Sequence, residues 1–143
     1  MKFKLIVDEH AEESLTIVCN KKREVFDQIE QLINNFDSKL IGYENDEIVI
    51  IKLEEVNCFI SENNKVYALV NNHKYLIKKR LYQVEELLDL SYIRINQSCI
   101  ANISKIIKFN VTFNGFLKVV FENKYEDYIS RRELKNVKER LGI

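Results

Sequence analysis

Apolar residues recur at helical spacing in one early segment of the chain and fall into short runs after it. The early segment spans residues 25–36, where apolar side chains three or four residues apart predict one face of a helix. From residue 47 the runs are short and rich in β-branched and aromatic residues, which is typical of strands. The pattern therefore predicts a mainly β chain with a helix before its strand-rich part.

Asparagine and glycine mark the turns between these runs. Asn63-Asn64 and Asn71-Asn72 separate three neighbouring runs, and asparagine tolerates the left-handed turn conformation. Asn114-Gly115, between two further runs, is a strong hairpin signal. The spacing predicts further helices at 81–88 and 131–141, and strands at 3–8, 14–19, 39–43, 48–53, 56–61, 65–70, 74–78, 92–95, 106–113, 116–122 and 125–129.

No proline and only three glycines occur in the chain, so no flexible linker separates its parts. The pattern changes near residue 45, and we expect two units that lie against each other. Residues 1–44 are expected to form an N-terminal arm of two strands and a helix, as a dimerisation or regulatory element. Residues 45–143 are expected to form a mainly β domain with short α-helices.

The formal net charge is zero, which by itself argues against a nucleic-acid partner. The charges are unevenly distributed, however. Residues 1–43 hold six Lys/Arg and eight Asp/Glu, whereas residues 94–143 hold ten Lys/Arg and five Asp/Glu. The C-terminal third can therefore present a basic face while the whole chain stays neutral.

The residue patterns of common catalytic and metal sites do not occur in the sequence. It contains no GxSxG, HExxH, P-loop or GxGxxG motif. Cys19, Cys58 and Cys99 form no CxxC pair, and three free thiols fit a reducing compartment. The N-terminus does not resemble a signal peptide, and no apolar run is long enough to span a membrane. We therefore expect a cytoplasmic protein that is not an enzyme and has no cofactor, metal or small-molecule substrate.

The closing helix begins with an unusual pair of cations. The stretch Ser130-Arg131-Arg132-Glu133 has the pattern of a capping box, in which the serine caps the helix and the glutamate reaches back. Both arginines then lie in the first helical turn, where the helix dipole disfavours cations. An external anion would reverse that effect. The pair therefore indicates an anion site, or else it points into solvent or pairs with Glu122 or Asp127.

The stretch Tyr92–Ile106 resembles the signature of the LytTR family of DNA-binding domains. That signature has an aromatic residue, an apolar residue, Arg, an apolar residue, two polar residues and Ser, then an apolar-rich run that ends in Asn. Three further segments resemble the family in the right order: an opening strand–turn–strand at 56–70, a strand and short helix at 75–88, and a closing motif at 128–142. The resemblance covers residues 45–143.

This resemblance implies an elongated fold of small stacked β-sheets with short helices. It also implies that loops of the domain enter successive major grooves of double-stranded DNA and recognise direct repeats. Three places are then expected to contact DNA. They are the turn Asn63-Asn64-Lys65, the turn Asn96-Gln97 and the pair Arg131-Arg132.

The chemistry of these residues suits DNA to different degrees. Arg132 can hold a guanine edge with two hydrogen bonds or bind a phosphate. Gln97 stands where the family usually has Lys or Arg, so it can read adenine but neutralises no phosphate. Arg94, Lys79 and Arg80 are expected either to bind phosphate or to brace the structure.

Familiar members of the family attach this domain to a phosphorylatable receiver domain, for which about 45 residues are too few. The arm instead resembles the extension of small stand-alone members, often encoded beside a membrane protein that restrains them. The resemblance thus implies a sequence-specific transcription regulator, with a homodimer and a membrane-protein regulator as further expectations. The alternative, which Gln97 and the neutral charge favour, is a protein-interaction module that keeps the fold without binding DNA.

Overall fold

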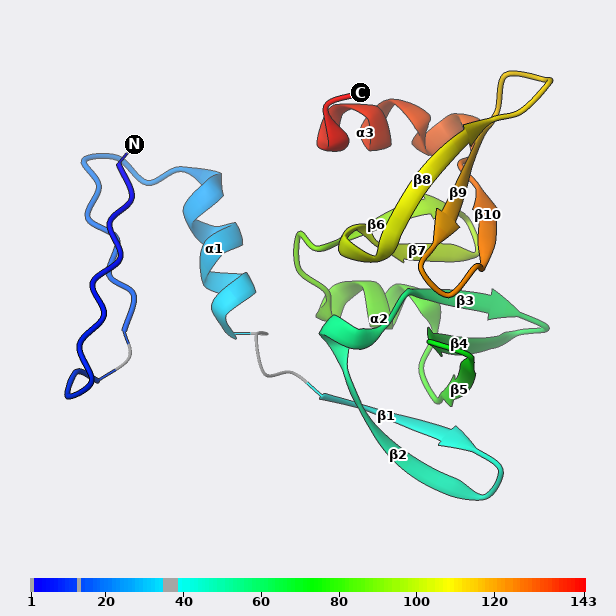
Figure 1. Ribbon diagram of the computed structural model, residues 1–143, viewed down its shortest axis with the longest axis horizontal. Coiled ribbons are helices and arrows are strands. Elements are labelled where there is room, and N and C mark those ends of the chain that lie inside the picture. Colours follow the sequence, from blue (N-terminus) through cyan, green and yellow to red (C-terminus); the bar gives the residue numbers. More distant parts are fainter. Residues whose placement is uncertain (1, 13, 35–38) are drawn as a thin grey trace.

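In the described residues, two antiparallel β-sheets and three α-helices form the structure (Figure 1). The computed structural model describes residues 2–12, 14–34 and 39–143. The helices are α1 (Glu24–Asn34), α2 (Leu81–Leu87) and α3 (Arg131–Leu141), with 3-10 turns at Leu53–Glu55 and Ile103–Lys105. The strands are β1 (Lys39–Glu44), β2 (Glu47–Lys52), β3 (Cys58–Glu62), β4 (Lys65–Val70), β5 (His73–Ile77), β6 (Tyr92–Asn96), β7 (Cys99–Asn102), β8 (Ile106–Val111), β9 (Leu117–Phe121) and β10 (Glu126–Tyr128). No helix in this described part has the length and apolar character to cross a bilayer.

The larger sheet has the strand order β2-β1-β5-β4-β3-β7-β6, and all its neighbouring strands are antiparallel. Two-residue turns connect several of them. Asn63 and Asn64, in the β3–β4 turn, have φ values of 51° and 62°, and Asn71, in the β4–β5 turn, has a φ of 52°. Consecutive residues with positive φ give a turn whose twist matches that of the strands, so the asparagine pair sets the β3–β4 register.

Two apolar clusters lie on opposite faces of the larger sheet. Phe59 faces the cluster beneath α2, whereas its neighbours Cys58 and Ile60 face the second cluster, as strand alternation requires. The smaller sheet, in the order β10-β9-β8, and α3 cover this second face. Phe121 of β9 and Val137 of α3 are fully buried there, so α3 is seated on β6 and β7 through the second cluster.

The arm differs from its predicted form. The predicted helix is confirmed as α1, although Phe36, the last residue of its apolar stripe, lies outside the described residues. The described parts of 3–8 and 14–19 are extended, but the prediction that they form strands is wrong (Figure 1). Phe3 and Val18 are 85% and 93% exposed, and two strands without a buried face are at best marginally stable.

The sequence pattern places the start of the β domain at residue 45. The larger sheet begins earlier, with β1 at Lys39. β1 pairs with β2 along its whole length, and Tyr43 pairs with Leu76 of β5. The arm contacts this body through α1, because Nε2 of Gln31 donates to the carbonyl of Leu88 at 3.3 Å. The division of the chain at residue 45 stays a prediction.

Gly42 leaves no room for a side chain in β1. A Cβ at this position would collide with Cδ1 of Ile51 and lie 2.8 Å from Cβ of Tyr75. We expect Gly42→Ala to lower the free energy of unfolding by about 1–3 kcal/mol, because overpacking displaces buried neighbours. Urea unfolding followed by circular dichroism measures the change, and an unaltered midpoint would show that Ile51 moves aside without cost.

Candidate nucleic-acid interface

Two of the three places expected to contact DNA lie side by side at one end of the larger sheet. Asn63-Asn64-Lys65 spans the β3–β4 turn, and Gln97 begins the β6–β7 turn. The backbone N–H of Ser61 donates to the carbonyl of Ser98 at 2.8 Å, which joins the two turns. They meet because the sheet places β7 beside β3.

The start of α3 lies against the same end of the sheet. The backbone N–H of Ser130 donates to the carbonyl of Ile95, close to the β6–β7 turn, at 2.9 Å. The Ser130 hydroxyl accepts a hydrogen bond from the N–H of Glu133 at 3.3 Å, which confirms the predicted cap. The bond to Ile95 takes the place of the predicted return contact from the Glu133 side chain. The third place is therefore docked onto the second.

Both arginines at the start of α3 are exposed. The Arg131 guanidinium lies 5.2 Å from the centroid of the Phe116 ring, within range of a cation–π interaction. Among the described residues, neither Arg131 nor Arg132 pairs with Glu122 or Asp127, whose side chains have other partners. The guanidiniums thus stay open to an anion at the positive end of the helix.

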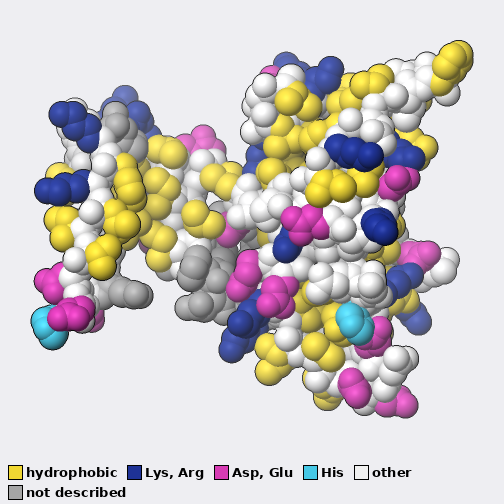
Figure 2. All heavy atoms as spheres, viewed as in Figure 1, with side chains coloured by type: hydrophobic (Ala, Val, Ile, Leu, Met, Phe, Trp, Pro, Cys, Tyr) yellow, Lys and Arg dark blue, Asp and Glu magenta, His cyan; other side chains and the backbone are white. Residues whose placement is uncertain are grey.

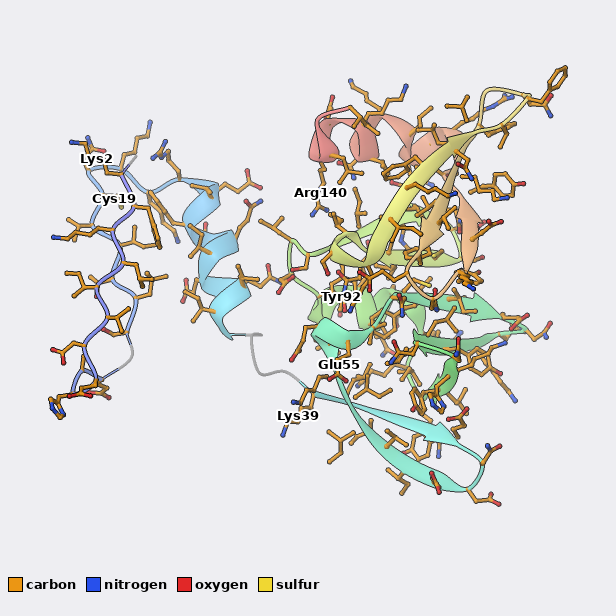
Figure 3. The ribbon with its side chains drawn as sticks, in the orientation of Figure 1. Lys2, Cys19, Lys39, Glu55, Tyr92 and Arg140 are labelled. Carbon is orange, nitrogen blue, oxygen red and sulfur yellow. The ribbon has the colours of Figure 1, made fainter. Side chains whose placement is uncertain are left out.

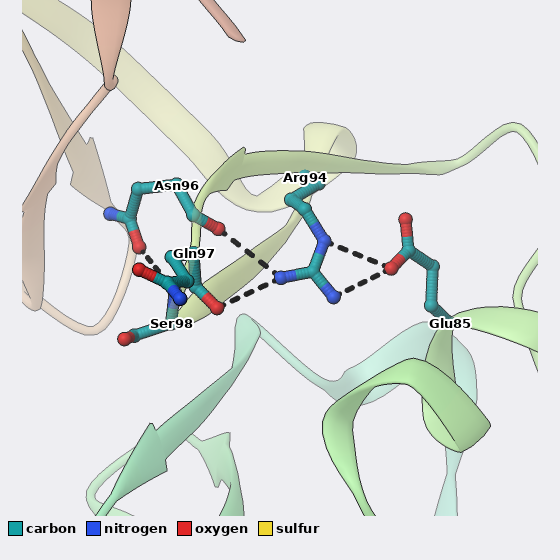
Figure 4. Close-up of polar contacts among 5 residues, drawn as sticks. All are labelled: Glu85, Arg94, Asn96, Gln97 and Ser98. Carbon is teal, nitrogen blue, oxygen red and sulfur yellow. Dashed lines mark hydrogen bonds and ion pairs between the residues drawn. The ribbon is translucent and has the colours of Figure 1, made fainter. Parts of the chain in front are cut away.

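Arg94 braces the β6–β7 turn from within (Figure 4). Its Nε and Nη2 donate to Oε2 of Glu85 at 2.9 and 2.6 Å. Its Nη1 donates to the carbonyls of Gln97 at 2.9 Å and Asn96 at 3.4 Å. This side chain is 21% exposed and ties α2 to the turn. The sequence left two roles open for Arg94, phosphate binding and bracing of the structure. Its contacts are those of a bracing residue.

Asn96 is also engaged within the protein. Its Nδ2 donates to Oδ1 of Asp127 at 2.9 Å and to the carbonyl of Tyr128 at 2.8 Å. Its Oδ1 accepts from the N–H of Ser98 at 2.8 Å. Both amide donors are used, so Asn96 holds the turn against β10. The adjacent Gln97 is exposed.

Gln97 and Arg132 line one hollow of about 480 Å³ between the β6–β7 turn and α3. Arg94, Ser130 and Glu133 complete its lining. The exposed amide can donate and accept at a base edge, while the guanidinium can bind a base or a phosphate. One polyanion can therefore engage both side chains.

A second hollow, of about 760 Å³, lies beside the β3–β4 turn. Asn64 and Lys65 line one side, and the basic segment Lys78-Lys79-Arg80 between β5 and α2 lines the other. The register of β4 with β5, in which Val66 opposes Ile77, brings them together. The cations of this hollow form no ion pair within the described ranges, so their charge is available to a ligand. They are Lys65, Lys78, Lys79 and Arg80.

Sequence reasoning missed Lys78 and the loop 112–116. Lys78 could have been found from the sequence, because it directly precedes two other basic residues, Lys79 and Arg80. Asn114 of the loop shares a hollow of about 460 Å³ with Asn96 and Ser130. The hairpin signal located this loop in the sequence but could not place it beside α3, because that depends on how the two sheets stack.

The far end of α3 is held by Arg140 (Figure 3). Its Nη1 donates to the carbonyl of Tyr92 at 3.0 Å and its Nη2 to that of Leu90 at 2.6 Å. Burial lowers the pKa of this guanidinium below its usual value, although an arginine stays protonated in proteins. With Ser130 and Arg140 both bonded to the β6 region, α3 presents Arg132 from a fixed support.

Comparisons with known proteins point to one family. A family model described as LytTr DNA-binding domain matches residues 46–142. An uncharacterized HTH-type transcriptional regulator of Staphylococcus aureus strain NCTC 8325 is 35% identical over 146 residues, covering 100% of this chain and 99% of that protein. A protein of the same description from strain MRSA252 matches to the same extent.

A solved structure supports the fold. It is described as a LytTr DNA-binding domain from Bacillus cereus and is similar with a TM-score of 0.69 at 20% identity, over 74% of this chain and 98% of that one. The likeness confirms the expected mainly β fold with short helices. Strands separate consecutive helices throughout the described part of this chain, so no helix-turn-helix is formed there.

Proposed function

The chain belongs to the LytTR family of DNA-binding domains, and from that premise we propose where it binds double-stranded DNA. It is a DNA-binding transcription regulator. We assign the contact to the turn edge, defined by residues 63–65, 78–80, 97 and 131–132. One observation carries this proposal: cations from three separate segments of this edge have no carboxylate partner within the described residues.

The members of the turn edge have different roles in this proposal. Arg132 reads a base edge or holds a phosphate beside Gln97, which reads a base. Lys65, Lys79 and Arg80 bind phosphate and position the duplex, and so does Arg131. Asn96 and Arg94 act indirectly, because their polar groups hold the β6–β7 turn in place. The alternative of an interaction module without DNA binding does not account for so many unpaired cations.

Selection of bound duplexes from random DNA tests this function. The recovered duplex is then titrated in mobility-shift assays at several salt concentrations. Each neutralised phosphate contributes about −0.9 to the slope of log affinity against log salt. One phosphate for each of the five cations given a role above (Lys65, Lys79, Arg80, Arg131 and Arg132) therefore predicts a slope of about −4.5. Failure to enrich any sequence, or binding that is insensitive to salt, would contradict the proposal.

Gln97→Lys is expected to tighten binding to any duplex and to steepen the salt slope by about 0.9, because it adds one phosphate contact. The matched control is Asn72→Lys, which adds the same charge at the exposed β4–β5 turn. The control should leave both quantities unchanged. Equal effects of the two substitutions would indicate a general charge effect rather than a contact at the turn edge.

Several expectations from the sequence remain predictions. We propose a direct repeat as the DNA target and the cytoplasm as the location, since a reducing compartment suits the free thiols of Cys19, Cys58 and Cys99. We propose no enzymatic activity for a member of a family of DNA-binding regulators. A homodimer formed through the arm is predicted as well, and so is a membrane-protein regulator.

A further inference from the structure

The N-terminal third of the chain carries an unusual amount of exposed apolar surface. Of twenty-one large apolar side chains that are exposed among the described residues, thirteen lie within residues 1–50. Ten of these belong to the arm, where apolar atoms gather on the face seen in Figure 2. Soluble monomers rarely expose contiguous apolar patches beyond a few hundred Å². This surface is therefore expected to bind a partner.

The other three exposed side chains lie on one face of the β1–β2 hairpin. Ile41 opposes Ile50 in the register, and Tyr43 opposes Ile48, so the isoleucines are neighbours. Ile41, Ile48 and Ile50 are 44%, 71% and 62% exposed. β2 is also one of the two edge strands of the larger sheet. An apolar edge strand is a template for the addition of another strand.

The arm offers segments that suit such an edge. Residues 3–8 and 14–19 have the apolar and β-branched composition of strands, yet neither is a strand in its described residues. One side of the arm is occupied, because Leu15 and Ile17 line a hollow of about 370 Å³ with Phe26 and Ile29 of α1. Phe3 and other apolar side chains of the first segment remain exposed.

The described residues of the arm do not cover the hairpin of their own chain (Figure 1). α1 is held on the body by the hydrogen bond from Gln31 to Leu88, and Leu32 lines a small hollow with Leu53 and Tyr92. From this attachment the extended segments project away from β1 and β2 (Figure 1). A second copy of the chain offers a complementary surface for each of these. Its arm can cover the hairpin of the first copy, and its hairpin can be covered by the arm of the first copy.

We propose that the arm of one copy covers the outward face and the β2 edge of the β1–β2 hairpin of a second copy, and that the contact is reciprocal. A reciprocal pair is closed and leaves neither apolar surface exposed. It has twofold symmetry, whereas copies on a direct repeat share one orientation, so we assign the pair to the DNA-free protein. This inference deepens the proposed homodimer, and its assignment to the DNA-free protein rests on the proposed direct repeat. The pairing of the two apolar surfaces does not depend on the DNA contact.

Sedimentation of the full chain without DNA tests the pair. Wild type should be a dimer, and Ile50→Glu should raise the dimer dissociation constant by roughly 100-fold, because each buried isoleucine is lost twice in a symmetric pair. Ile107→Glu, at a 56% exposed position on β8, is the matched control and should leave the constant unchanged. A monomeric wild type, or equal effects of both substitutions, would overturn the proposal.

Cross-linking identifies which chain covers the hairpin. In a Cys19→Ser background, a Val7→Cys protein is mixed with an Ile50→Cys protein and treated with a short bismaleimide. The proposal predicts a cross-linked heterodimer. A chain carrying both substitutions that cross-links only within itself would assign the hairpin to its own arm. A third outcome is that no cross-link forms and that the thiol introduced at position 50 is protected only when lipid vesicles are added. That outcome would assign the hairpin to a membrane partner. Either outcome would contradict the proposal.

Discussion

Arg132→Ala is expected to weaken binding to the selected duplex by about 1–3 kcal/mol, from roughly fivefold to over a hundredfold. The guanidinium lines the hollow shared with Gln97 and has no competing carboxylate within the described residues. The substitution would remove the bidentate contact to a base or phosphate that we propose for this guanidinium, and a neutral side chain cannot replace it. Mobility shifts with the selected duplex and with an unrelated duplex measure the loss of affinity and of discrimination.

Two control variants distinguish recognition from charge. Lys138→Ala removes one exposed cation from the last turn of the same helix and should leave affinity nearly unchanged. Arg132→Lys keeps the charge but lacks the planar fork, so it should keep the salt slope and lose discrimination between duplexes. If Lys138→Ala weakened binding as much as Arg132→Ala, the start of α3 would have no special role.

Phe121→Ala is expected to lower the free energy of unfolding by about 3–5 kcal/mol. Phe121 is fully buried where the smaller sheet and α3 meet the larger sheet. The change removes a large aromatic side chain and leaves a cavity that the surrounding strands cannot fully close. Because small domains have only about 5–15 kcal/mol of stability, the urea midpoint should fall steeply.

Phe113→Ala provides a matched control for this prediction. Phe113 lies at the tip of the β8–β9 loop and is fully exposed, so the same substitution removes no buried contact. We expect its effect to stay within about 0.5 kcal/mol. A comparable loss of stability in both variants would mean that the interface between the sheets contributes little to folding.

Local features of the structure could be predicted from the sequence. The helical spacing of apolar residues located α2 and α3, and Ser130 marked the start of α3. The asparagine pair at 63–64 marked a turn because its residues adopt positive φ at little cost. These features depend on residues close together in the chain, where sequence patterns act directly.

The arm shows where such patterns are insufficient. Residues 3–8 and 14–19 have the apolar and β-branched composition of strands. A strand also needs a partner and a buried face, and neither is supplied by the residues themselves. These two segments therefore resemble strands in sequence but do not form strands in a single copy of the chain. Because these segments have no partner strand in a single copy, their apolar side chains stay exposed.

The sequence by itself determined the mainly β character, most of the turns and the three basic or polar places where DNA contact is expected. Only the tertiary structure decided that these places share one edge, since strand order and sheet stacking join residues distant in the chain. It also decided that Arg94 and Asn96 brace the turn while Gln97 and Arg132 stay open. A side chain's role depends on the partners that folding places beside it, and those partners are not neighbours in sequence.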